Sequence, residues 1–375
     1  MQTLLPILIA SLLLAYLTER TTVGEYGGPE QQTSQNKMFF FLLIAVLALP
    51  IGLRRMYNDT NAYINGFQNS LTLTELLTSN DLHILQNPAF KIYTALMRTL
   101  TDNYHIYFMI PAFFVQYAFV RFIRKYSPSF VLGIGLYFLL GTYVFSIAAM
   151  KQTIAMAFLL LAIPYLLEKK YLPFLLLVFT AFLFHTYAIT FVILPLFTVR
   201  PWSFRTFLLI VAVLLVMDNF ETAIGSFLDY AGESGKDIAE YEVFDNSSIN
   251  GLRVAVYAVC PALCFLLRRY LFLSKEDEPY QLLIHMSIIS VAIMSLGTIS
   301  GANMFGRMAQ YFEFGMICGL PWIITKSFEP KSAKLVAALG ACCFFAYFFY
   351  AYQINLVFDD HYRTITLFQF LQSLF

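Results

Sequence analysis

Apolar stretches long enough to cross a lipid bilayer recur along almost the whole chain, and they limit its fold more than any other feature. A membrane helix needs roughly 20 residues, so each stretch predicts one crossing. Charged residues make up only 13% of the 375 and hydrophobic ones 59%, which excludes a soluble enzyme, a fibrous protein and a disordered chain. The stretches lie near residues 3–18, 37–53, 103–121, 129–147, 150–167, 171–184, 186–199, 205–217, 252–267, 280–299, 306–325 and 334–357.

We therefore expect an all-α fold: one polytopic transmembrane domain over 1–375 with about twelve transmembrane helices. No Lys or Arg precedes the first stretch, so it is interpreted as a retained helix rather than a signal peptide. The half-polar segment 54–102 is expected to lie at the outer face, with short interfacial helices between 71 and 100. An acidic segment at 218–251 predicts an outer lid loop.

Basic residues set the predicted orientation, because short cytoplasmic connections are enriched in Lys and Arg. This assignment requires a helix break near His185 rather than one helix over 171–199, and it places both termini outside. The connections expected in the cytoplasm carry Arg20, Lys37, Arg121, Arg124, Lys125, Lys169, Lys170, Arg200, Arg205, Arg268, Arg269, Lys275, Lys326, Lys331 and Lys334.

Motifs for common cofactors are missing from the sequence. The five histidines are scattered, no metal-ligand spacing is found, and there is neither a P-loop nor a dinucleotide fingerprint. All five cysteines fall in predicted spans, so no structural disulfide is expected. The formal net charge of +1 gives no reason to expect nucleic acid as a partner. We predict no metal and no cofactor.

Basic residues at the outer ends of predicted helices are the unusual feature. They are Arg54, Arg55, Lys151, Arg253 and Arg307. The last three are expected near helix N-termini, where the helix dipole repels cations, so a bound anion would explain them. All are expected at one depth, together with Asp59 and His185.

The segment 297–307 adds to this pattern, because its glycines would let the backbone approach an anion and Ser300 or Asn303 could cap the helix. A tight outer loop with a snorkelling Arg307 is the alternative. Further along the same predicted helix are Gln310, Tyr311 and Glu313. An acidic residue inside the membrane, such as Glu313, is a candidate functional residue. The alternative is a buried ion pair with Lys151 or Arg307 that only stabilises the helix packing. His185 is interpreted as a catalytic or substrate-contacting residue. The alternative is a histidine whose hydrogen bonds are satisfied within a polar helix break.

Several short runs in the sequence resemble motifs of a known family. The runs are Gly52-Leu53-Arg54-Arg55 with Asp59-Thr60-Asn61-Ala62-Tyr63, Lys151-Gln152-Thr153, Phe184-His185 and Arg307-Met308-Ala309-Gln310-Tyr311. The family that they resemble is that of the EpsG/Wzy-type exopolysaccharide polymerases, which include capsule and O-antigen polymerases. The order of the runs covers nearly the whole chain. Two positions depart from the family pattern: Lys151 stands where the family more often has Arg, and Asn58 where it usually has Gly. Lysine keeps the charge but loses the bidentate geometry of arginine.

This resemblance implies a GT-C-like membrane glycosyltransferase in the bacterial plasma membrane, with an active site that faces outward. The enzyme would transfer a growing glycan from undecaprenyl diphosphate to a sugar hydroxyl of a lipid-linked repeat unit, without a metal. A flippase and a chain-length regulator would be its partners. The departing diphosphate needs stabilisation and the hydroxyl must lose a proton.

Each need has candidate residues. Arg54, Arg55, Lys151, Arg253 and Arg307 are the candidates for diphosphate binding. His185, then Asp59, then Glu313 are the candidates for the general base. The candidates for sugar contacts are Tyr63, Gln152, Gln310, Tyr311, Tyr230 and Tyr241. The last two lie in the acidic loop, for which the alternative interpretation is a solvated surface loop without a role in binding.

Other functions stay open at this stage. A transporter or flippase of lipid-linked sugars would also need cations for diphosphate, but it predicts a midplane site between related halves. An O-antigen-ligase-type transferase would differ only in its acceptor. A hydroxyl-acylating enzyme would use an intramembrane histidine.

Overall fold

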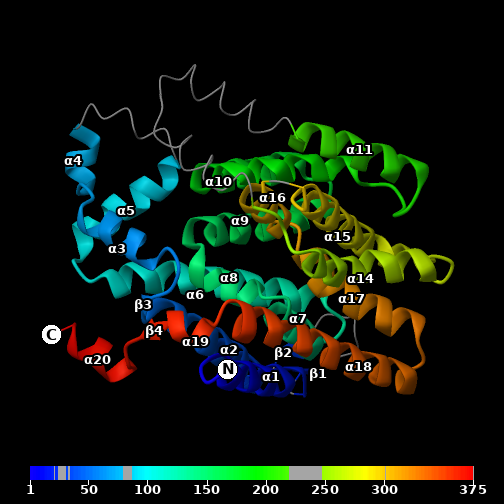
Figure 1. Cartoon of the computed structure of the whole chain (residues 1–375), viewed down its shortest axis with the longest axis horizontal. Helices are drawn as coiled ribbons and strands as arrows, with labels where there is room; N and C mark the ends of the chain where they lie inside the picture. Colours follow the sequence, from blue (N-terminus) through cyan, green and yellow to red (C-terminus); the bar gives the residue numbers. More distant parts are fainter. Residues whose placement is uncertain are drawn as a thin grey trace. The chain divides into compact units, whose positions relative to one another are not determined.

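The computed structural model describes residues 1–20, 22–23, 31–32, 34–78, 87–218, 247–299 and 301–374. Almost all of its regular structure is helical, and the only strands described are four short ones, so the all-α prediction is confirmed (Figure 1). The chain forms two compact units. Unit 1 comprises Met1–Thr186 and Ala337–Phe375, and unit 2 comprises Tyr187–Val336.

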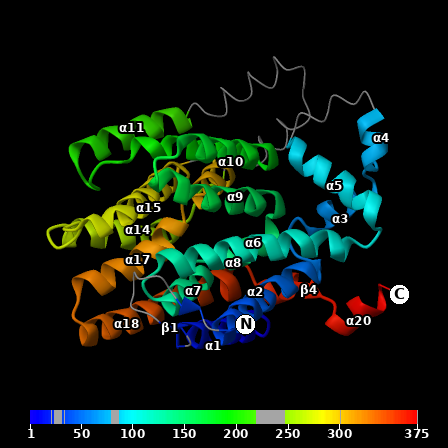
Figure 2. The same ribbon diagram turned by 180° about the vertical axis from the view of Figure 1, so that it is seen from behind.

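Unit 1 is built on long apolar helices that lie against one another. Helix α2 contacts α1 and α6, α6 contacts α9, and α9 contacts α10, as two opposite views show (Figures 1 and 2). These helices are apolar on most of their surface, as expected of helices surrounded by protein and lipid. The helices are α1 (Leu4–Arg20), α2 (Ser34–Gly52), α3 (Thr60–Gln68), α4 (Leu73–Thr78), α5 (Pro88–Leu100), α6 (Tyr104–Tyr126), α7 (Phe130–Leu139), α8 (Thr142–Ala148), α9 (Met150–Leu167) and α10 (Tyr171–Phe184).

The C-terminal part of the chain returns to unit 1. Helix α18 (Pro330–Phe349), whose residues up to Val336 belong to unit 2, continues into the π-helix Tyr350–Asn355, followed by α19 (Phe358–His361), β4 (Arg363–Thr364) and α20 (Leu367–Gln372). Strand β4 pairs antiparallel with β3 (Arg54–Met56), and the register shifts between Arg54 and Met56. A second two-stranded pair joins β1 (Thr22–Val23) to β2 (Gln31–Gln32). The pairing of β3 with β4 therefore places the C-terminal segment next to Arg54 and Arg55.

Unit 2 packs around α15, which contacts α11, α14, α16 and α17 (Figure 2). Its core contains close helix contacts: a Cβ on Gly315 would lie 2.3 Å from the carbonyl oxygen of Leu283. Its elements are a 3₁₀ helix (Thr186–Leu196, whose first residue belongs to unit 1), α11 (Phe204–Asp218), α14 (Gly251–Leu267), a 3₁₀ turn (Lys275–Asp277), α15 (Glu278–Leu296), α16 (Ala302–Gln310) and α17 (Phe314–Ser327).

Among the described residues, fewer helices meet the length and hydropathy required of a membrane span than the twelve that the sequence predicts. In the described ranges, four helices are long and apolar enough to cross a bilayer, or five if the bent pair α7 and α8 forms one span. Five further apolar helices are shorter. Exposed apolar side chains are frequent, for example Phe41, Leu176 and Phe207, each more than half exposed, which is typical of a surface that faces lipid. The chain is therefore a polytopic membrane protein, while twelve spans and a GT-C-like architecture remain predictions.

Breaks within apolar segments explain part of this difference. Helices α7 and α8 meet at 56°, where Gly141 adopts a φ of +85° and the space of a Cβ is filled by the hydroxyl of Tyr352. The predicted helix over 306–325 is interrupted at 311–313, between α16 and α17. A break at His185 is confirmed: α10 ends at Phe184, His185 has extended backbone, and a 3₁₀ helix follows.

Candidate functional site

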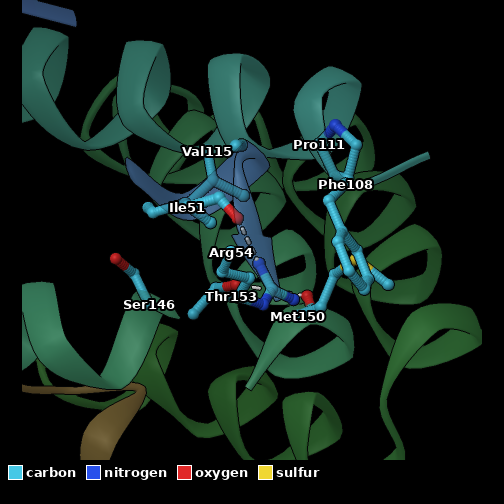
Figure 3. A pocket seen from close by; sticks show the side chains of 9 residues that line it. Ile51, Arg54, Phe108, Pro111, Val115, Ser146, Met150 and Thr153 are labelled. Atoms are coloured by element: carbon cyan, nitrogen blue, oxygen red, sulfur yellow. Dashed lines mark hydrogen bonds between the residues drawn. The ribbon is translucent and has the colours of Figure 1, made fainter. Parts of the chain in front are cut away.

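Arg54 is the most deeply buried of the predicted site residues in unit 1, with 1% of its surface exposed. Its Nη1 donates to the carbonyl oxygen of Ile51 at 2.8 Å, and its Nε donates to Oγ1 of Thr60 at 3.2 Å. The guanidinium also lies 4.0 Å from the ring centre of Phe108 on α6 (Figure 3). Arg54 thus joins the end of α2, the start of α3 and the side of α6.

The charge of Arg54 is not balanced by a carboxylate: no ion pair involves it among the residues that the structure describes. Its Nη2 has no hydrogen-bond partner there and is buried. Beside it is a cavity of about 10 Å³ lined by side chains that include Ser146, Met150 and Thr153 (Figure 3). Burial lowers the pKa of Arg54 to about 10, against the opposing effects of nearby groups that include Tyr63 and Asp59. Because this pKa lies well above 7, Arg54 stays charged at neutral pH. A cavity of this volume holds about one water molecule.

The turn after the arginines places Asp59. Asp59 occupies the N-cap position of α3, but its carboxylate makes no capping hydrogen bond, and it is half-buried. Before it, Asn58 adopts a φ of +43°, in the left-handed region that favours glycine. Asparagine tolerates this region better than most residues. The structure therefore explains why asparagine can stand where the resemblance expects glycine.

This backbone conformation gives a direct test. We expect Asn58→Ala to lower the free energy of unfolding by about 1 kcal/mol, because a Cβ without a hydrogen-bonding side chain is disfavoured at positive φ. Asn58→Gly should leave stability nearly unchanged. Thermal unfolding of both variants in detergent measures the difference, and equal stability of the alanine and glycine variants would contradict the strain argument.

Lys151 lies in the first turn of α9, as the sequence predicts. Its Nζ is 5.1 Å from the ring centre of Phe90 on α5, and its backbone N–H donates to the hydroxyl of Tyr63 at 3.5 Å. Tyr63 and Phe90 meet edge to face at 6.0 Å. Lys151 is half-buried and the neighbouring Gln152 is 2% exposed. Segments near residues 60, 90 and 150 thus converge in unit 1.

His185 is offset from this cluster. The ring of Phe184 stacks on that of Phe158 at 5.5 Å, which aligns the end of α10 with the middle of α9. Phe158 follows Lys151 by seven residues, or about 10 Å of helix. The expectation that Lys151 and His185 share one depth is therefore wrong for this helix pair, because α10, with 14 residues, ends before it reaches the start of α9.

The C-terminal segment contacts β3, the strand that carries Arg54 and Arg55 and is called the arginine strand below. This contact was not predicted from the sequence. The hydroxyl of Tyr362 donates to the carbonyl oxygen of Pro50 at 2.6 Å, and Oγ1 of Thr364 donates to that of Leu53 at 2.9 Å. The ring of Tyr57 contacts those of Phe358 and Tyr362. No pattern in a single sequence indicates a pairing across about 310 residues.

In unit 2, Arg253 lies near the N-terminus of α14, as predicted, and Asn250 caps this helix by accepting from the N–H of Leu252. The anion beside Arg253 is Glu313: Nη2 and Oε1 are 3.4 Å apart, and Glu313 is 1% exposed. The sequence suggested Lys151 or Arg307 as the partner of such a pair. Because Glu313 is the N-cap residue of α17, its charge is also favoured by the helix dipole.

Arg307 occupies the last turn of α16 rather than the start of a helix, so the prediction of dipole repulsion there is wrong. Gly301, with a φ of +66°, is the N-cap of α16, and Asn303 lies inside the helix. A Cβ on Gly297 would lie 2.5 Å from Ile249, so this glycine accommodates the chain's own side chain. The prediction that the glycines of this loop let the backbone approach an anion finds no support in these contacts.

Gln310 and Tyr311 are both buried at the break between α16 and α17, and Oε1 of Gln310 has no hydrogen-bond partner among the described residues. Oγ of Ser290 donates to the carbonyl oxygen of Ala309 at 3.0 Å, which satisfies part of the interrupted helix. Tyr230 and Tyr241, with most of the predicted acidic loop, lie outside the described residues. No group of three metal-binding side chains is found in the ranges that the structure covers.

Apolar helices with buried polar residues at their breaks and ends define a polytopic membrane protein of the all-α class. The chain belongs to the EpsG family, whose family model matches residues 37–369. At the level of the family, this supports an exopolysaccharide polymerase of the glycosyltransferase type. No curated protein and no solved structure matches the chain significantly.

Proposed function

We propose that this protein polymerises a polysaccharide on the outer face of the bacterial plasma membrane, from repeat units carried on undecaprenyl diphosphate. The observation that supports this best is the convergence of Arg54, Asp59, Tyr63 and Lys151 in unit 1, because these residues come from the runs on which the resemblance to the family rests and lie within the matched range. Arg55 follows Arg54 in β3. The anomeric carbon–oxygen bond to diphosphate breaks, and the acceptor hydroxyl oxygen forms the new glycosidic bond. The leaving diphosphate keeps the electron pair, and a base takes the hydroxyl proton.

The two arginines have different roles in this proposal. Arg55 is exposed and Lys151 half-buried, so both can contact a diphosphate. Arg54 is too deeply buried to do so and positions the strand that carries Arg55. Arg55 and Lys151 would supply the positive charge that a divalent metal supplies in many phosphate-transferring enzymes. Arg253 is engaged by Glu313, and Arg307 remains a sequence-based proposal for diphosphate binding.

Asp59 is our first choice of general base in this geometry. Its carboxylate is half-exposed, takes no part in capping and lies near Arg54, whereas Glu313 is paired and His185 is offset from Lys151. Asp59→Asn should lower the turnover of lipid-linked repeat units by about 10²–10⁴-fold at unchanged stability. His185→Ala should have a smaller effect. A larger loss for the histidine variant would return His185 to the first place.

The proposed function is tested by incubating the purified protein with lipid-linked repeat units and no nucleotide sugar. We expect a ladder of longer lipid-linked products, in the presence and absence of a chelator. Loss of the ladder with chelator would contradict metal independence. In a parallel incubation that also contains lipopolysaccharide core, a single product on that core would indicate a ligase instead.

A transporter of lipid-linked sugars is the second candidate, because helices are interrupted in both units: at Gly141 in unit 1 and at 311–313 in unit 2. Discontinuous helices are frequent in transporter binding sites. Reconstitution in liposomes separates the two functions. Translocation of repeat units without elongation would support the transporter and refute the polymerase.

A further inference from the structure

Unit 1 contains an open groove of about 640 Å³ next to the arginine strand. Its lining residues come from the end of α3, the start of α6, and the segment that leads from β4 into α20. Figure 1 shows where these elements lie within unit 1. This volume is within the roughly 300–1,000 Å³ of small-molecule sites. The residues that line it and matter here are Arg55, Gln68, Tyr104, His105, Gln369 and Ser373.

The walls of the groove are held by contacts of their own. Nδ1 of His105 lies 3.1 Å from the carbonyl oxygen of Gly52, and the His105 ring meets Phe370 of α20 edge to face at 6.2 Å. Nδ2 of Asn103 donates to Oγ of Ser373 at 2.9 Å. A capping box between Thr366 and Gln369 starts α20. The groove is thus a preformed part of this unit.

Helix α20 has two chemically different sides. Gln369 and Ser373, one turn apart, line the groove. Leu367, Phe368 and Leu371 are each at least 47% exposed. A short helix with exposed apolar residues beside a polar groove suits the membrane interface, where the head group of a lipid-linked substrate lies.

We propose that this groove binds a sugar ring of the lipid-linked glycan, which extends the proposed function and rests on it. The amide of Gln68 can donate to and accept from sugar hydroxyls, and Nε2 of Gln369, whose Oε1 accepts from the Thr366 N–H, can donate to them. The half-buried ring of Tyr104 offers an apolar face for a pyranose. Arg55 places a cation at the same groove for the diphosphate that carries the sugar.

The test is equilibrium binding to the purified chain in nanodiscs with two probes: lipid-linked repeat units from producing cells, and undecaprenyl diphosphate without sugar. A Gln68→Ala/Tyr104→Leu variant should bind the repeat unit at least tenfold more weakly and undecaprenyl diphosphate unchanged. Asn65→Ala, an exposed position on the same helix outside the groove lining, is the matched control. Unchanged repeat-unit binding, or equal loss for both lipids, would overturn the sugar assignment.

A milder variant guards against misfolding. Ser373→Cys, coupled to a bulky maleimide, should block the groove and weaken repeat-unit binding at least tenfold. The labelled unsubstituted chain is the control, because Cys342 and Cys343 are also exposed. Normal binding by the labelled variant would refute the site. Binding needs no turnover, so a chain that binds repeat units here without elongating them would refute only the polymerase.

Discussion

Replacing Arg54 with alanine should abolish polymer elongation and lower the free energy of unfolding by about 2–4 kcal/mol. The variant loses two hydrogen bonds from a charged donor, each contributing about 1.5–3 kcal/mol, and the contact with Phe108. Removing a buried charge recovers part of that loss. Thermal unfolding in detergent and repeat-unit turnover measure the two effects.

Arg55→Ala is the matched control for this prediction. Arg55 is exposed, so its loss should leave stability within about 0.5 kcal/mol while it reduces turnover. Arg54→Lys keeps the charge but cannot make both bonds in the same geometry, and it should be intermediate. Full activity of Arg54→Ala, or a stability loss of Arg55→Ala as large as that of Arg54→Ala, would contradict the division between a positioning and a contacting arginine.

Removing one partner of the Arg253–Glu313 pair should destabilise the protein more than removing both. Glu313 is almost fully buried, so Arg253→Met leaves a buried carboxylate without its cation and should cost about 2–3 kcal/mol. This is less than for a fully buried pair because Arg253 is 31% exposed. The double variant Arg253→Met/Glu313→Gln should recover most of the stability.

The same double variant separates structure from catalysis. If Glu313 only pairs with Arg253, turnover should recover together with stability in the double variant. Turnover that stays at least 10²-fold low while stability recovers would assign Glu313 a catalytic role. Unfolding curves and repeat-unit turnover of the single and double variants complete the cycle.

Local sequence rules predicted several features correctly. The distribution of basic connections required the break at His185, and the positions of Lys151 and Arg253 in the first turns of their helices are confirmed. The family followed from short motifs and their order. Arg307 shows where such rules fail: the apolar stretch that begins at residue 306 suggested a helix start there, but α16 is only nine residues long and Arg307 lies in its last turn.

Membrane class, the all-α fold and the family were available from the sequence alone, because hydropathy and short motifs are local properties of the chain. Which charges are paired, and which groups face a groove, depended on tertiary contacts. Arg54 and Arg55 are adjacent and chemically identical, yet one is buried under Phe108 and the other lines an open groove. The strand β3 that carries both pairs with β4 from the C-terminal end of the chain, and such a pairing depends on packing of the whole unit.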